Sequence, residues 1–254
     1  MKRMWKTKYL PWAVGGLGLA GCVLRWSLYS LFTDSRGLLP RMHPAELVLW
    51  LVTALTAALA WAGTRRLSGS ERYGDNFSVS LAAALGHILL GSGILLTVLL
   101  NAPVVAGRMG QLWKVLGILS APALFYAGFA RVMGKKPNFL CYVMVSIFFA
   151  LHLVCHYRIW CSDPQLQNYG FVFAGTLGLM VFAYYQAAAC VEMGKRRQLL
   201  AVGLVTAYFC LVSLPHAQYL YLLLGGALWS LTGLCRIEGV PSRDENAGDG
   251  YAAP

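Results

Sequence analysis

Long apolar stretches, separated by short polar segments, dominate the pattern of this chain. A helix needs about 20 apolar residues to cross a hydrocarbon core of about 30 Å, and several stretches reach or approach that length. The stretches are Leu10–Phe32, Leu47–Ala62, Leu81–Leu100, Leu112–Val132, Phe139–Tyr157, Phe171–Val191, Leu199–Leu214 and Tyr219–Cys235. The pattern therefore predicts an all-α, polytopic integral membrane protein with about eight transmembrane helices.

The last two stretches are separated only by the segment 215–218, with the sequence Pro-His-Ala-Gln. A single helix over 199–235 would be roughly 55 Å long at 1.5 Å per residue, which far exceeds the thickness of the bilayer core. A tight hairpin is therefore predicted here, and the whole chain is expected to form four successive helical hairpins.

Positive charge collects in every second gap between the stretches. One side of the predicted membrane holds 15 of the 21 Lys and Arg residues. They are Lys2, Arg3, Lys6, Lys8, Arg65, Arg66, Arg72, Arg131, Lys135, Lys136, Lys195, Arg196, Arg197, Arg236 and Arg243. Because an excess of Lys and Arg in short loops marks the cytoplasmic side, we expect a multi-pass protein of the cell membrane, such as a bacterial inner membrane, with both termini cytoplasmic.

The composition is typical of a membrane protein and restricts the classes of binding partner. Only 12% of the residues are charged and 58% are hydrophobic, whereas about a quarter of a soluble domain is charged. The net charge of +11 would suggest nucleic acid if it formed one patch, but the basic residues lie in short clusters at the ends of apolar stretches. The expected partner is therefore the lipid bilayer, and no nucleic acid.

The chain is expected to form one transmembrane bundle over 1–235. The first stretch continues for more than twenty apolar residues, which favours a retained span that also serves as the insertion signal. The tail over 236–254 is rich in Gly, Ser, Asn and acidic residues, and we expect it to be a disordered cytoplasmic tail. No pair of the seven cysteines has the CxxC spacing of a metal or redox motif.

Histidines supply the first candidate site. His43, His152, His156 and His216 are all predicted on the non-cytoplasmic side, and His152 and His156 share one helical face because they are four residues apart. Such a pair can bind a transition metal if a third ligand, such as His216, comes from another helix. A haem held by two histidines would need His216 or His87 as the second axial ligand. No motif requires either cofactor.

The alternative interpretation of the histidines is structural. A histidine near a membrane interface can direct its polar tip to the surface or bond a neighbouring carbonyl. Aromatic residues near the span ends, Trp113 and Tyr219 among them, are typical of the aromatic belts at the two interfaces.

Arg25 supplies the second candidate site, because it lies inside the first apolar stretch, roughly 10 Å below its outer end. An arginine costs at least ~2.5–3.5 kcal/mol at the bilayer centre and less near the edge, so a partner is expected. Glu46 and Asp163 are the candidates. Asp163 and Pro164 suit a helix start, which would bring Gln165 to the outer surface.

The candidate ligand-binding residues are Arg25, Glu46, His152, His156, Asp163 and Gln165. Arg25 and Glu46 could equally form a structural tie between the first two helices.

Two further patterns concern packing. Glycines such as Gly18, Gly21, Gly86 and Gly91 are expected to allow close helix contact. The sequence Met-Gly-Lys-Lys at 133–136 recurs as Met-Gly-Lys-Arg at 193–196. This recurrence fits either a duplicated hairpin or two ordinary helix ends, where glycine and cations are both favoured.

Three functions fit these features. The first is the binding or transport of a small solute in an outward-facing cavity. The second is a non-catalytic membrane subunit or sensor that docks a membrane or cytoplasmic protein partner. The third is an enzyme or redox carrier with a metal or haem at the histidines. The concentration of polar residues at one set of helix ends favours the first, which is not an enzyme.

Overall fold

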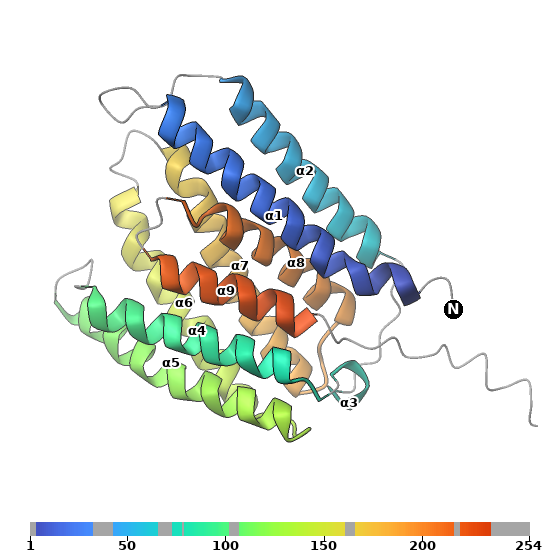
Figure 1. Cartoon of the computed structure of the whole chain (residues 1–254). Coiled ribbons are helices and arrows are strands. Elements are labelled where there is room, and N and C mark those ends of the chain that lie inside the picture. Colours follow the sequence, from blue (N-terminus) through green and yellow to red (C-terminus); the bar gives the residue numbers. More distant parts are fainter. Residues whose placement is uncertain are drawn as a thin grey trace, which may run out of the picture.

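The computed structural model describes residues 4–32, 43–65, 73–77, 79–101, 107–160, 166–215 and 219–234, without the side chains of 4–8, 75, 158–160 and 166–168. Within these ranges the chain is all-helical (Figure 1). The helices are α1 (Met4–Phe32), α2 (Pro44–Thr64), α3 (Tyr73–Asn76), α4 (Leu81–Leu100), α5 (Arg108–Val132), α6 (Phe139–Trp160), α7 (Leu166–Cys190), α8 (Arg196–Val212) and α9 (Leu220–Leu234). We call the end where α1 begins the inner end, and the opposite end the outer end.

The eight long helices coincide with the eight predicted stretches, and the polytopic all-α prediction is confirmed. Six of them, α1, α2 and α4 to α7, are long and apolar enough to cross a membrane. The remaining two, α8 and α9, have 17 and 15 residues and are shorter than a usual span. Both run through the middle of the bundle (Figure 1). They are packed against other helices there, so they need not span the full lipid thickness by themselves.

Helices α4 to α9 form a ring. Each packs on the next one along the chain, and α9 closes the ring by packing along α4. The α1–α2 hairpin lies outside this ring and rests mainly on α8. The expectation of four successive hairpins is therefore correct for the chain path. The closing contact, by contrast, joins two helices whose residues are 120 or more positions apart in the sequence, with Leu81 of α4 and Leu234 of α9 both at the inner end.

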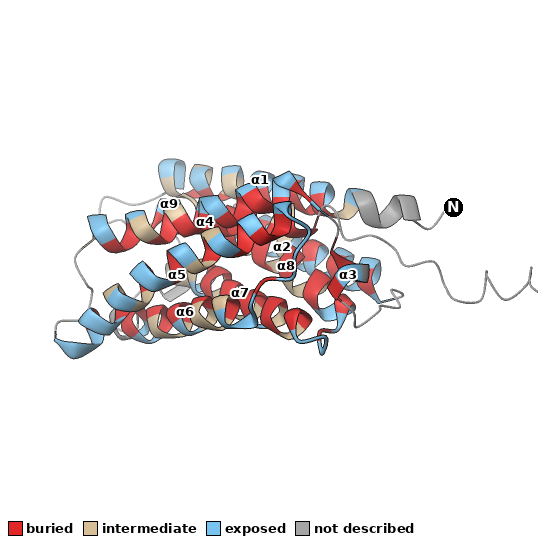
Figure 2. Cartoon of the chain, turned by 90° about the horizontal axis from the view of Figure 1, so that it is seen from below, coloured by how far each residue is buried: buried red, intermediate tan, exposed pale blue. Residues whose placement is uncertain are grey.

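Burial follows this arrangement. Figure 2 shows buried residues on the helix faces that meet other helices and exposed residues on the outward faces. The apolar window of α4 is 56% buried and that of α2 only 22%, so α4 belongs to the centre and α2 to the periphery. The outward residues include large apolar side chains such as Leu51 and Leu99, which is the surface that a bilayer solvates.

Glycines bring α4 and α9 into backbone contact. A Cβ at Gly225 would lie 2.8 Å from the carbonyl oxygen of Leu89, and one at Gly86 would lie 2.9 Å from the Cα of Trp229. A Cβ at Gly93 would overlap the carbonyl group of Tyr221. Side chains are therefore excluded at three levels of this contact, in agreement with the packing role expected for the glycines.

The recurrent Met-Gly-Lys sequence does not mark equivalent positions. After α5, Gly134 has φ +67°, and the amide of Lys135 donates to the carbonyl of Ala130, which is a Schellman helix end. After α7, the residue in this conformation is Glu192, with φ 61°, and Gly194 follows two residues later. The two turns therefore end their helices in different registers, which favours two separate helix ends over a duplicated hairpin.

Substitution of Gly93 tests the closing contact. We expect Gly93→Ala to lower stability by about 1–3 kcal/mol, because the added methyl group meets backbone that cannot turn aside. Gly16 on α1 has no atom within 4 Å of the corresponding position, so Gly16→Ala should be neutral or stabilising by up to about 1 kcal/mol. Thermal unfolding in mild detergent measures both, and equal effects of the two substitutions would contradict the assigned contact.

Candidate functional site

The candidate residues from the sequence fall into two groups within the described part of the chain. His152 and His156 lie together on α6, inside the ring, whereas Arg25 lies where α1 meets α8. Asp163, Gln165 and His216 lie outside the described residues, so their proposed roles stay predictions.

The histidine group is built from four side chains at the outer ends of α5, α6 and α9. The rings of His152 and His156 stack with centroids 3.9 Å apart. Trp113 Nε1 of α5 donates to His152 Nδ1 at 3.1 Å, and the Tyr219 hydroxyl, next to the start of α9, lies 2.7 Å from His156 Nε2. All four residues are at most 4% exposed. We call them the outer histidine cluster.

The hydrogen bonds fix the tautomers of the neutral rings. His156 Nδ1 lies 2.7 Å from the carbonyl oxygen of His152, which only accepts, so Nδ1 carries the proton and Nε2 accepts from Tyr219. Trp113 Nε1 only donates, so Nδ1 of His152 accepts and the proton of His152 is on Nε2. One assignment of the ring protons therefore satisfies all three hydrogen bonds of the cluster.

His152 Nε2 is the remaining donor of the cluster. Among the described residues, no hydrogen bond to it is present, although the residue is only 1% exposed. The cluster is thus suited to bind an acceptor oxygen, such as that of a carbonyl, hydroxyl or carboxylate group.

These hydrogen bonds also affect whether His152 and His156 could bind a metal or a haem. Three of the four ring nitrogens of His152 and His156 already make hydrogen bonds, and the fourth carries a proton. Metal ligation would need at least one of these bonds to break. No group of three or more metal-ligating side chains occurs in the described ranges, and the third proposed ligand, His216, lies outside them.

The other histidines have local roles. His87 of α4 bonds the Tyr142 hydroxyl at 2.9 Å, and Tyr142 is ten residues before His152 on α6, roughly 15 Å along the helix axis. This distance separates His87 from the outer cluster and does not suit a shared haem. His43 caps α2, with its Nδ1 accepting from the amide of Ala45 at 3.2 Å.

Arg25 is 4% exposed and binds the end of a helix. Its Nη1 donates to the carbonyl oxygen of Val212 at 3.1 Å, the last residue of α8, where the helix dipole favours a cation. Its guanidinium also lies 5.2 Å from the centroid of the Phe171 ring. Arg25 therefore ties α1 to α8 and α7.

Glu46 lies apart from Arg25 among the described contacts. It occupies the first turn of α2, where a carboxylate is favourable near the helix N-terminus. The expected tie between Arg25 and Glu46 is absent from the described ion pairs, which consist of Lys136 with Glu192 at 3.1 Å. Arg25 donates to a helix carbonyl, and its other candidate partner, Asp163, lies outside the described residues.

Two members of the cluster were missed by sequence reasoning. Trp113 and Tyr219 were expected in interfacial aromatic belts, which is wrong, since they are 1% and 4% exposed and bond the histidines. Their sequence positions near span ends are the same as those of belt residues such as Trp61, which is 57% exposed. The two kinds of residue differ only in whether their side chain meets another helix or the outer surface of the bundle.

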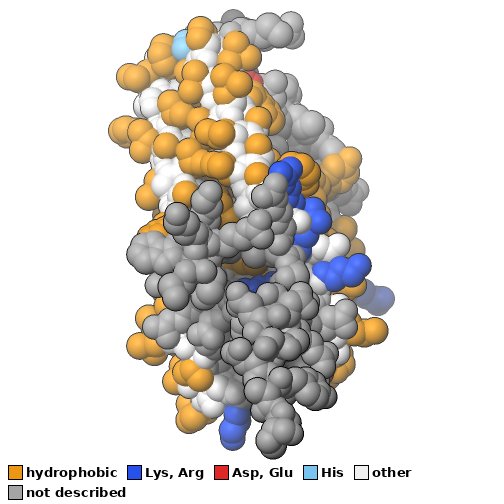
Figure 3. Space-filling view, turned by 90° about the vertical axis from the view of Figure 1, so that its right-hand side faces the viewer, with side chains coloured by type: hydrophobic (Ala, Val, Ile, Leu, Met, Phe, Trp, Pro, Cys, Tyr) orange, Lys and Arg blue, Asp and Glu red, His pale blue; other side chains and the backbone are white. Residues whose placement is uncertain are grey.

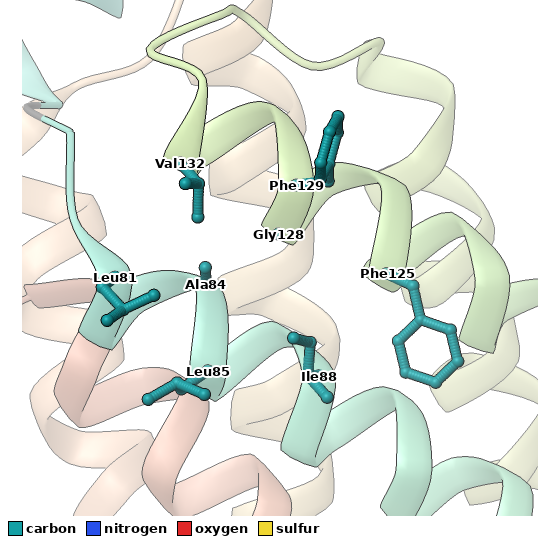
Figure 4. Close-up of a pocket in the computed structure, with 8 residues that line it drawn as sticks. All are labelled: Leu81, Ala84, Leu85, Ile88, Phe125, Gly128, Phe129 and Val132. Atoms are coloured by element: carbon teal, nitrogen blue, oxygen red, sulfur yellow. The ribbon is translucent and has the colours of Figure 1, made fainter.

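A groove of about 350 Å³ lies between the inner ends of α4 and α5 (Figure 4). Its lining is apolar and includes Leu81, Ile88, Phe125 and Val132. The groove is far along the helices from the outer histidine cluster, and its lining offers no polar side chain to a polar solute.

Comparison with protein-family models, with curated proteins and with solved structures finds no match.

Removal of the Tyr219 hydroxyl tests the donor order of the cluster. Tyr219→Phe leaves His156 Nε2 without its donor, and we expect a loss of about 1–3 kcal/mol in stability. Tyr221, two residues later, is 52% exposed, so Tyr221→Phe is the matched control and should change little. Thermal unfolding in detergent compares the two, and a Tyr219→Phe protein as stable as wild type would refute the assigned bond.

Proposed function

We propose that this membrane protein binds a small polar solute at the outer end of the six-helix ring, with His152 as the first contact. The observation that carries the proposal is the unmet donor of His152 Nε2 in a buried and otherwise bonded cluster. Because Trp113 and His156 hold the ring, the donor is oriented before a ligand arrives, which lowers the entropy cost of binding.

The packing of the ring favours a binding protein or carrier over an open pore. Trp113, Phe148, Phe149, Phe182 and Trp229 are at most 1% exposed and fill the space between the helices. A solute that enters from the outer end can pass further only if helices move. Transport is accordingly proposed as a second step that follows binding and needs a conformational change.

We also propose that the inner end faces the cytoplasm. In the described ranges, the inner ends of the helices and their turns carry Arg65, Arg131, Lys135, Lys136, Lys195, Arg196 and Arg197. The inner end of α1 adds Lys6 and Lys8, and the outer ends carry Arg108, Lys114 and Arg158. This bias supports cytoplasmic termini in a multi-pass protein of the cell membrane.

Reporter fusions test the orientation. A fluorescent protein that folds only in the cytoplasm, fused after Pro254, should be fluorescent, and alkaline phosphatase at the same position should be inactive. Fusions truncated after Phe32 should give the opposite pair of results. Active phosphatase on the C-terminal fusion would place the inner end outside and overturn the orientation.

Substitution of His152 tests the solute site. Acetate, as a carboxylate probe, and glycerol, as a hydroxyl probe, are titrated against the purified protein while its thermal unfolding is followed. We expect at least one probe to raise the unfolding temperature of wild type, His152→Gln to keep part of the shift because its amide can donate, and His152→Phe to abolish it.

The comparison uses the shift caused by each probe, because both substitutions also change the intrinsic stability through Trp113. Gln165→Ala is a further comparison that tests the predicted outer polar turn. An equal shift in wild type and His152→Phe would show that the probe binds elsewhere, and the absence of a shift for both probes would remove support for an acceptor-oxygen ligand.

A further inference from the structure

Arg131, in the last turn of α5, is a buried cation at the inner end of the ring. It is 4% exposed. Its Nη1 lies 3.5 Å from the Tyr73 hydroxyl of α3, which is the outer limit of a hydrogen bond. Its Nε is buried and has no partner among the described residues. The guanidinium therefore retains hydrogen-bonding capacity in a place where water is largely excluded.

The groups around Arg131 reduce the cost of its charge without neutralising it. The guanidinium lies over the ring of Phe77 at 4.3 Å, and the C-terminus of α5 favours a cation. Such contacts offset only part of the cost of burying a charge that has no opposite charge beside it. Burial raises the pKa of the Tyr73 hydroxyl, so this neighbour stays neutral and supplies no anion.

Among the described side chains, no carboxylate forms an ion pair with Arg131. The sequence has ten acidic residues, and none lies within α4 to α9. Of the described carboxylate side chains, Glu46 begins α2 at the outer end, and Glu192 is half-exposed and paired with Lys136. The ring thus contains Arg131 and three histidines but no acid of its own.

The neighbours of Arg131 add to the surplus of donors. A Cβ at Gly128, three residues before Arg131 on α5, would lie 3.1 Å from the Cβ of His87, and the His87 ring meets the Trp229 indole edge-on with centroids 5.8 Å apart. Trp229 Nε1, which can only donate, is a second buried donor without a partner in the described part of the chain. Figure 3 views this end of the molecule and shows Lys and Arg side chains there.

We propose that Arg131 is the centre of a binding site for a phosphate group at the inner end of the ring. The planar guanidinium, with its Nε edge unused, can donate two parallel hydrogen bonds to an oxyanion, which is the geometry by which arginine binds phosphate. The ligand supplies the negative charge that helices α4 to α9 lack.

The phosphate group has two sources with the same chemistry. One is a free phosphate or phosphorylated solute from the inner side, and the other is the headgroup of an anionic phospholipid. Arg131 lies in the last turn of α5, and the headgroups of a bilayer lie near the ends of its transmembrane helices. This inference does not rest on the proposed solute site at His152, which is at the other end of α6.

The test measures thermal unfolding of the full chain, purified in mild detergent and freed of lipid, in sodium phosphate and in sodium chloride of matched ionic strength. If the source is free phosphate, a hundred-fold excess over Kd should raise the unfolding temperature of wild type by roughly 5–10 °C. Arg131→Lys keeps the charge but loses the planar fork, so it should show less than half of the shift, and Arg131→Gln should show none.

A second titration adds phosphatidylglycerol or phosphatidylcholine micelles in buffer without phosphate. A shift with phosphatidylglycerol that exceeds the shift with phosphatidylcholine, and that Arg131→Lys loses, assigns the site to an anionic lipid. Arg197, exposed in the first turn of α8 at the same end, gives the control: Arg197→Lys should respond as wild type does. His152→Phe should also keep this response, which separates the two sites.

Two results overturn the proposal. The first is that neither inorganic phosphate nor phosphatidylglycerol stabilises wild type. The second is that Arg131→Lys responds as fully as wild type and Arg197→Lys, because the anion then binds the basic surface and not Arg131. Since Arg131→Lys preserves charge and length, it keeps the test valid if Arg131→Gln does not fold.

Discussion

The backbone contact between α4 and α9 is the constraint on which the rest of the structure depends. It closes six helices into a ring, and it exists because Gly86, Gly93 and Gly225 leave no side chain between the two backbones. With the ring closed, the short helices α8 and α9 are held by their neighbours. The residues that face inward from α4 to α9 then share one enclosed space.

That space has few ways to accommodate polar groups, and the chain uses one arrangement twice. His87 and His156 each have Nδ1 at 2.7 Å from the carbonyl oxygen four residues earlier, and each has a tyrosine hydroxyl from another helix at Nε2. A neutral histidine is fully bonded in this way without any charge. The pair of His87 with Tyr142 belongs to the inner half of the ring, and the pair of His156 with Tyr219 to the outer half.

Against this background, the groups that remain unmet are informative. Arg131 Nε at the inner end is a buried donor without a partner among the described residues. His152 Nε2 at the outer end is also a donor, and the ring helices carry no acid to accept from either. Both proposals follow from this imbalance, because a buried donor without an acceptor is costly and a ligand oxygen removes the cost. The two sites differ in charge, so a neutral acceptor is sufficient for His152 while Arg131 requires an anion.

The sequence by itself determined the helices, because about 20 apolar residues in a row have no other stable form in a bilayer, where each backbone group needs an internal partner. It also placed His152 and His156 on one face, since a spacing of four is a local property of a helix. It did not place Trp113 and Tyr219 beside them, and it suggested Glu46 where Arg25 binds the carbonyl of Val212. These contacts join residues from 39 to 187 positions apart. They depend on how each helix is rotated about its axis, and that rotation is set by packing against the other helices and not by a local sequence pattern. The burial of Arg131 beneath α3 also depends on tertiary structure. A cation at the end of a transmembrane helix is normally exposed to water, and this one is buried only because the tertiary structure covers it.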